Sequence, residues 1–199
     1  MRWHSPAVVD TVGVRGRRIA AALLAASLLS ACSTFSDRIA RVEQRLVAGD
    51  FDAAAAALER IDFAERDQAL LLLNRGMLAR YRGDLVASNA DLEAAKQRMQ
   101  ALAALSIREG VLASTVTEQA GSYAGQPFER LLVPVFKAFN YLDLGDPDAA
   151  RVEALQIDLL LRELGEGRDE ATVAGAAFAR YVAGLVYELG GERSDAFIA

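Results

Sequence analysis

The chain has 199 residues, of which 53% are hydrophobic and 25% charged, and only four are proline. This composition is too apolar for a disordered chain and favours one or two helical domains. The formal net charge of −5 provides no basic surface of the kind that binds nucleic acid, so nucleic acid is excluded as a partner.

The N-terminus has the pattern of a secretory signal. Residues 15–18 read Arg-Gly-Arg-Arg, and residues 19–29 (IAAALLAASLL) carry no charge. A basic segment, then a short apolar segment, then small residues are typical of a signal peptide. Eleven to thirteen apolar residues span only about 20 Å as a helix, short of the ~30 Å hydrocarbon core of a bilayer. We therefore expect residues 1–31 to be a cleaved signal peptide.

The only cysteine of the chain, Cys32, follows this segment directly. Residues 29–32 (LSAC) resemble the lipobox of bacterial lipoproteins, which implies cleavage between Ala31 and Cys32 and a lipid anchor on Cys32. Residues 32–199 hold 18 basic and 26 acidic side chains, a net charge of −8, so acyl chains and not a basic patch would bind the membrane. Ser33 and not Asp follows the cysteine, and by analogy with the sorting of enterobacterial lipoproteins this resemblance implies the periplasmic face of the outer membrane over the inner membrane. The alternatives are an ordinary signal that happens to contain a cysteine, or a cysteine buried in an alanine-rich helix.

Two residue counts limit the possible chemistry. A single cysteine excludes an intrachain disulfide framework and a cysteine-cluster metal site. The single histidine, His4, lies upstream of the expected cleavage site, so the mature chain would lack Ser-His-Asp and Cys-His catalysis and histidine-bound metals. We expect no metal, no cofactor and no enzyme activity. Carboxylate-only chemistry, as in glycoside hydrolysis, stays open, although no Asp or Glu stands out from the charged helix faces.

After a polar tether at residues 32–40, a glycine followed by an acidic residue recurs between apolar helical stretches. Glycine takes the left-handed conformation that ends a helix, and aspartate caps the start of the next helix. Each occurrence therefore predicts a turn between two helices. The occurrences are Gly49-Asp50, Gly83-Asp84, Gly145-Asp146 and Gly190-Gly191-Glu192.

The first two of these glycines are 34 residues apart, which is the tetratricopeptide period. The helices also resemble that repeat at its small and aromatic positions, which are Gly76, Ala138, Gly184, Tyr141, Tyr187, Ala54, Ala150 and Ala196. We therefore expect an all-α, tetratricopeptide-like superhelix of helix hairpins. Repeats 1–2 would occupy residues 41–105 and repeats 3–4 residues 128–199, the last repeat being incomplete. The alternative is a generic alanine-rich helical bundle with Gly-Asp turns.

The period breaks between Gly83 and Gly145, which are 62 residues apart. Residues 106–127 contain three glycines, a β-branched cluster and a Gly-Gln-Pro breaker. These features predict a loop-rich insertion, for which a segment of extended strand is an alternative to loop alone. Long structured loops of this kind are more often functional than simple connections. The repeat alignment starts the next helix near Val133, which would place Pro134 at an allowed first-turn position.

Two short patterns stand out near this insertion. The first consists of Tyr123, Gly125, Phe128, Glu129 and Arg130, and the second of residues 140–146 (NYLDLGD) and 150–153 (ARVE). Together they resemble a poorly characterised group of bacterial helical-repeat lipoproteins that carry Y-x-G-x-x-F-E-[RK] before N-Y-L-x-L-G-D-x-x-x-A-R-V-E. The resemblance covers roughly residues 120–199 and agrees with the lipobox. It implies an envelope lipoprotein of a group sometimes encoded near activators of peptidoglycan synthases.

In a tetratricopeptide-like superhelix the first helix of each hairpin lines the concave face. Counting from that template places eight apolar and charged residues there, which suits an extended or helical peptide. We expect these residues to bind an envelope protein or peptide; the alternative is that some pack against the insertion. The residues are Met77, Arg80, Tyr81, Phe139, Leu142, Asp143, Leu185 and Glu188.

These features together predict a non-catalytic scaffold or activator in the bacterial cell envelope, bound to the membrane through lipid on Cys32. One alternative is an assembly factor for outer-membrane or secretion machinery. The other is a carboxylate-based hydrolase of cell-wall glycan. A scaffold and an assembly factor need the same groove and the same anchor, so the sequence does not separate them.

Overall fold

The computed structural model describes residues 35–108, 122–164 and 170–191 of the chain. By its internal contacts the chain divides into two units, residues 1–41 and residues 42–199. The described part of the first unit is the beginning of one helix, α2 (Phe35–Val47). The expected cleavage and lipidation site at Ala31 and Cys32 lies outside the described residues.

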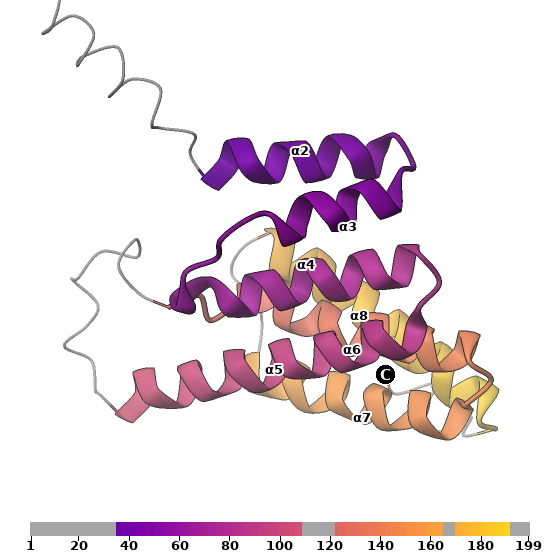
Figure 1. Ribbon diagram of the computed structural model, residues 1–199. Helices are drawn as coiled ribbons and strands as arrows, with labels where there is room; N and C mark the ends of the chain where they lie inside the picture. Colours follow the sequence, from indigo (N-terminus) through magenta and orange to yellow (C-terminus); the bar gives the residue numbers. More distant parts are fainter. Residues whose placement is uncertain (1–34, 109–121, 165–169, 192–199) are drawn as a thin grey trace, which may run out of the picture. The chain divides into compact units, whose positions relative to one another are not determined.

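The described residues are all-α and contain no strand, which confirms the predicted fold class. In residues 42–199 the described helices other than α2 follow one another along the chain as shown in Figure 1. They are α3 (Phe51–Glu59), the 3-10 helix η1 (Glu65–Asp67), α4 (Gln68–Tyr81), α5 (Leu85–Arg108), α6 (Pro127–Asp143), α7 (Pro147–Leu164) and α8 (Glu170–Leu189).

The predicted Gly-Asp turns are confirmed. Gly83 has a φ of +80°, its N–H donates to the carbonyl of Arg80, and Asp84 N–H donates to the carbonyl of Ala79, each at 2.9 Å. This is the hydrogen-bond pattern that closes a helix on a left-handed glycine. The side chain of Asp84 then accepts from the N–H of Ala87 at 3.1 Å and caps α5. The same glycine conformation recurs at Gly49, Gly145 and Gly191, and the same aspartate cap at Asp50 and Asp146.

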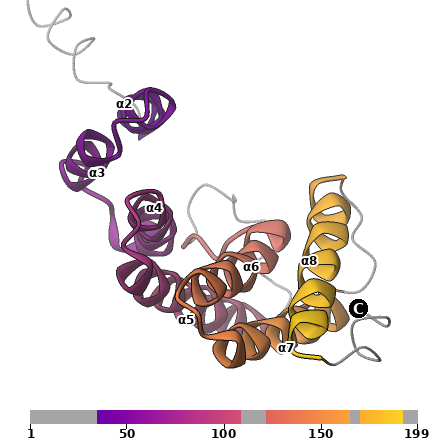
Figure 2. The same cartoon turned by 90° about the vertical axis from the view of Figure 1, so that its right-hand side faces the viewer.

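These turns fold the helices into neighbouring pairs. α4 packs against α5 and α6 against α7, and each pair runs side by side in Figure 1. α6 lies between α5 and α8 (Figure 2), while α7 also contacts α8. The spacing is not uniform, because Gly145 and Gly191 are 46 residues apart and not 34.

Small residues let the paired helices approach closely. A Cβ on Gly76 of α4 would lie 2.9 Å from Cγ of Leu92 on α5, so that position tolerates no side chain unless the neighbour moves. Alanines such as Ala138, Ala150 and Ala154 are fully buried in the core shared by α6, α7 and α8. A second cluster joins Ala69 of α4 to Leu92 and Met99 of α5 and to Val133 of α6.

α6 begins six residues earlier than the repeat alignment predicts. Pro127 occupies its first turn, a position that suits proline, and Pro134 lies in its middle. The expected start near Val133 is therefore wrong. Pro134 has no N–H to donate within the helix, but burial of Val133, Pro134 and Val135 favours the continuous helix. α5 also continues to Arg108, past the predicted repeat boundary at residue 105, and residues 109–121 of the insertion lie outside the described residues.

The left-handed turn at Gly83 predicts a specific stability cost. A Cβ added at this position would have no atom within 4 Å, so Gly83→Ala would cost only backbone strain, about 1–2 kcal/mol. The matched control is Gly190→Ala, since Gly190 is not among the positive-φ glycines, and it should change stability much less. Urea denaturation would measure both free energies of unfolding, and equal losses would contradict this account of the turn.

Candidate functional site

Three of the eight predicted groove residues meet at the C-terminal ends of α4 and α6. Arg80 Nη2 lies 3.2 Å from Asp143 Oδ2, and the Arg80 guanidinium lies 5.8 Å from the centroid of the Phe139 ring. Arg80 also donates a hydrogen bond to Asn140 Oδ1. These contacts join the two helix ends and hold the Phe139 ring against a cation.

Four of the eight predicted residues line one hollow between α6 and α8. This hollow, the α6–α8 groove, has a volume of about 300 Å³. Apart from one carboxylate, that of Glu188, its walls are apolar. The predicted residues Phe139, Leu142, Leu185 and Glu188 are joined there by Val182, Val186 and Leu189.

α8 extends the apolar surface beyond the groove. Phe178, Tyr181, Leu185 and Leu189 are 43%, 64%, 38% and 68% exposed, and their spacing of three and four residues places them on one helix face. The Phe178 ring also contacts the Phe139 ring, with centroids 6.4 Å apart. We call these four residues the α8 stripe. Contiguous exposed apolar side chains of this kind are typical of interaction sites.

The other two predicted residues lie elsewhere. Tyr81 stacks on Phe51 of α3, with ring centroids 5.4 Å apart, and lines a separate hollow with Asp52 and Arg82. Met77 is half-buried on α4 and is not among the residues that line the α6–α8 groove. Of the predicted residues on α6 and α8, all but Asp143 line this groove, and none of those on α4 does.

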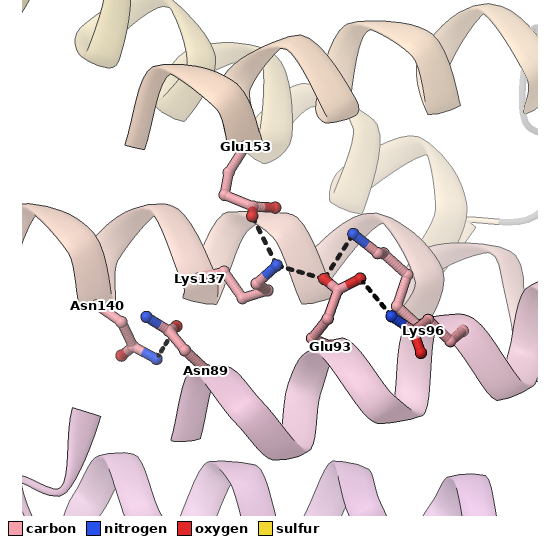
Figure 3. Close-up of polar contacts among 7 residues, drawn as sticks. Asn89, Glu93, Lys96, Lys137, Asn140 and Glu153 are labelled. Carbon is pink, nitrogen blue, oxygen red and sulfur yellow. Dashed lines mark hydrogen bonds and ion pairs between the residues drawn. The ribbon is translucent and has the colours of Figure 1, made fainter. Parts of the chain in front are cut away.

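The middle of α6 carries a buried lysine. Lys137 is 4% exposed, and its Nζ lies 2.5 Å from Glu93 Oε2 on α5 and 2.6 Å from Glu153 Oε1 on α7. Lys96 Nζ reaches Glu93 Oε2 from the other side at 2.7 Å. Figure 3 shows these four side chains converging from three helices. Two positive and two negative charges therefore offset one another inside the helix assembly.

The pKa values follow from these contacts. Burial by itself lowers the pKa of Lys137, but hydrogen bonds to Glu153 and Glu93 outweigh it and raise that pKa. Burial by itself raises the pKa of Glu93, but hydrogen bonds from Lys137 and Lys96 lower it to about 2. Lys137 and Glu93 are therefore both charged at neutral pH.

Asn140, about one turn further along α6, forms a second polar cluster (Figure 3). It is completely buried, and its Nδ2 donates to Ser88 Oγ and to Asn89 Oδ1 on α5, both at 2.8 Å. Its Oδ1 accepts from Arg80. Each polar group of the amide thus has a partner, as burial requires, and α6 is tied both to α5 and to α4.

Sequence reasoning missed this network. Lys137 stands in the apolar stretch LLVPVFKAFNYL, and a lone cation in such a stretch is the signal that could have revealed it. Its partners Glu93 and Glu153 are 44 and 16 residues away and have no local signature. Asn140 and Glu153 do belong to the N-Y-L…A-R-V-E pattern. Asn140 bonds α6 to α5, and Glu153 pairs α7 with Lys137 of α6, so both residues of the pattern contribute to helix packing.

The Y-x-G-x-x-F-E-R pattern closes the start of α6. Glu129 Oε2 accepts the N–H of Gln126 at 2.7 Å and also the phenol of Tyr123, which satisfies a free donor at the helix start. Burial and then Glu129 raise the pKa of Tyr123. Gly125 has a φ of +77°, and a Cβ there would overlap Met99 Sδ of α5. Glu129 therefore caps α6, and Gly125 allows the segment before α6 to lie close against α5.

No protein-family model matches the chain, and no curated protein or solved structure is significantly similar to it. In the described ranges, no group of three or more His, Cys, Asp or Glu side chains is placed to hold a metal ion. Within the same ranges, no helix is both long enough and apolar enough to cross a membrane.

Lys137 and Lys96 both pair with Glu93, but we expect their replacement to cost different amounts of stability. Lys137→Met leaves Glu153 buried without its cation, so the free energy of unfolding should fall by about 3–5 kcal/mol. Lys96→Met, the matched control, leaves both carboxylates paired with Lys137 and should cost much less. The double variant Lys137→Met/Glu153→Leu should recover part of the loss. Chemical denaturation measures all three, and equal losses for the two lysines would contradict the network.

The lowered pKa of Glu93 predicts a pH dependence of stability. The folded pKa is about 2 against an ordinary value of 4.5, so the unfolded chain takes up a proton first as the pH falls. Stability from this group is therefore complete above about pH 5 and is lost between about pH 5 and pH 2. Glu93→Gln should flatten this loss in urea titrations at several pH values, whereas Glu43→Gln, at an exposed position of α2, should keep the wild-type slope. Parallel slopes for wild type and Glu93→Gln would exclude this assignment.

Proposed function

We propose that the chain is a non-catalytic, lipid-anchored scaffold of the bacterial envelope that holds a partner protein in the α6–α8 groove. The observation that carries this proposal is the apolar groove itself, with the exposed α8 stripe beside it. Apolar grooves between helices accept the apolar face of a helical or extended peptide.

The polar contacts of α6 with α5 and α7 favour a groove that is already formed in the absence of a partner. Lys137 ties α6 to α5 and α7, and Asn140 ties it to α5. Phe139 contacts both the Arg80 guanidinium and the Phe178 ring, so this wall of the groove is held by contacts to two other helices. A preformed site loses less conformational entropy on binding than a mobile one.

The anchor and the repeat interpretation belong to the same proposal. Cys32 after the apolar segment 19–29 resembles a lipidation site, and the two patterns of residues 122–156 resemble those of envelope lipoproteins. The helix pairs α4–α5 and α6–α7, joined by Gly-Asp turns, agree with a tetratricopeptide-like arrangement in which α4, α6 and α8 are the first helices of their hairpins. Lipid on Cys32 would hold the groove at the membrane where its partner works.

Site-specific photo-crosslinking in cells tests this function. A photoreactive phenylalanine analogue replaces Leu185 in the groove or, as the matched control, Val86 on α5, which is 69% exposed. We expect one discrete envelope protein, identified by mass spectrometry, to be crosslinked from residue 185 and not from residue 86. Cys32→Ser should abolish the crosslink, because the chain would no longer be held at the membrane. No product from residue 185, or the same products from both residues, would refute the proposal.

A further inference from the structure

The charge of the groove, together with its shape, points to the chemistry of the partner. We propose that the α6–α8 groove binds an amphipathic helical segment that carries a lysine or arginine beside its apolar face. This inference rests on the proposed function and goes further, because it assigns to Glu188 the role of recognising the cation.

The C-terminal ends of α6 and α8 each carry a negative side chain, where a positive one is usual. The C-terminal end of a helix has a partial negative charge, so basic side chains are the stabilising residues there. The last turns of α6 and α8 contain no basic residue, and each contains a carboxylate instead, Asp143 and Glu188. A local preference that is broken in this way is expected mainly at functional sites.

The two carboxylates differ in their partners. Asp143 is paired with Arg80 at 3.2 Å. Glu188 is exposed and lines the groove, and its side chain has no hydrogen bond or ion pair to any residue that the structure describes. Among the described residues, Glu188 is therefore a negative charge without a partner on an otherwise apolar wall. A cation on the partner would complement it, and electrostatic complementarity of this kind provides specificity.

The α8 stripe indicates a helix as the occupant. The stripe covers the twelve residues from Phe178 to Leu189. The two ends lie about 16 Å apart along the helix axis, which matches three turns of a partner helix. Apolar side chains of the partner at i, i+3 or i+4, and i+7 would then meet this face. Since Glu188 lies at one end of the stripe, the basic residue is expected at the matching end of the partner helix.

Peptide display against the purified full chain tests the assignment. The probe is a library of helical peptides with random residues, selected on wild type, on Leu185→Glu and on Glu188→Lys. Wild type should enrich apolar faces next to Lys or Arg, and Glu188→Lys should enrich Asp or Glu at the same place. A peptide selected on wild type should lose affinity about tenfold on Glu188→Lys. The matched control is Glu170→Lys at the other end of α8, about 27 Å away, which should leave affinity unchanged.

The outcomes separate this inference from the function on which it rests. Peptides that Leu185→Glu excludes, but whose charge preference does not reverse with Glu188→Lys, would overturn the cation assignment and leave the groove as a binding site. If no selected peptide depends on Leu185, both the groove and the cation assignment are overturned. Self-association of the wild-type chain that Leu185→Glu abolishes, seen by analytical ultracentrifugation, would make a second copy the occupant and overturn the inference.

Discussion

The buried charge of Lys137 is the constraint on which the rest of the helix assembly depends. An ammonium group that is 4% exposed is stable only with charged partners and good geometry. Glu93 on α5 and Glu153 on α7 provide both. If α6 turned or slipped against either neighbour, this pairing would be lost and an uncompensated charge would stay buried. The pairing therefore fixes the rotation and the register of α6, and Asn140 fixes them a second time one turn later.

This constraint also determines what α6 presents to α8. Phe139 comes two residues after Lys137, and Leu142 comes two residues after Asn140. Two residues of an α-helix correspond to a rotation of about 200°, so each apolar side chain points away from the polar side chain before it. One face of α6 is thus occupied by charge and amide contacts, and the opposite face provides an apolar wall for the groove. The contacts that pack α6 against α5 and α7 and the residues that line the groove therefore lie on different faces of one helix.

The features predictable from sequence were local ones. Gly83 and Asp84 indicate a helix end and a helix start through their own backbone preferences. Counting from such turns grouped Phe139, Leu142, Leu185 and Glu188, and these four residues line a common hollow. The features that were missed depend on distant residues. Lys137 can be buried because Glu93, on another helix, pairs with its charge. Tyr81 stacks on Phe51 of α3 and does not line the α6–α8 groove. The early start of α6 was missed because a uniform repeat length was assumed.

Hydrogen exchange tests most directly whether a partner covers the α6–α8 groove in the envelope. Exchange would be compared between the full chain in native envelope vesicles and the same chain after purification away from other proteins. We expect slower exchange in the vesicles for the last turn of α6 and for residues 178–189 of α8, and we expect Leu185→Glu to remove this protection. Equal exchange of these segments in both preparations, or protection confined to other helices, would contradict this expectation.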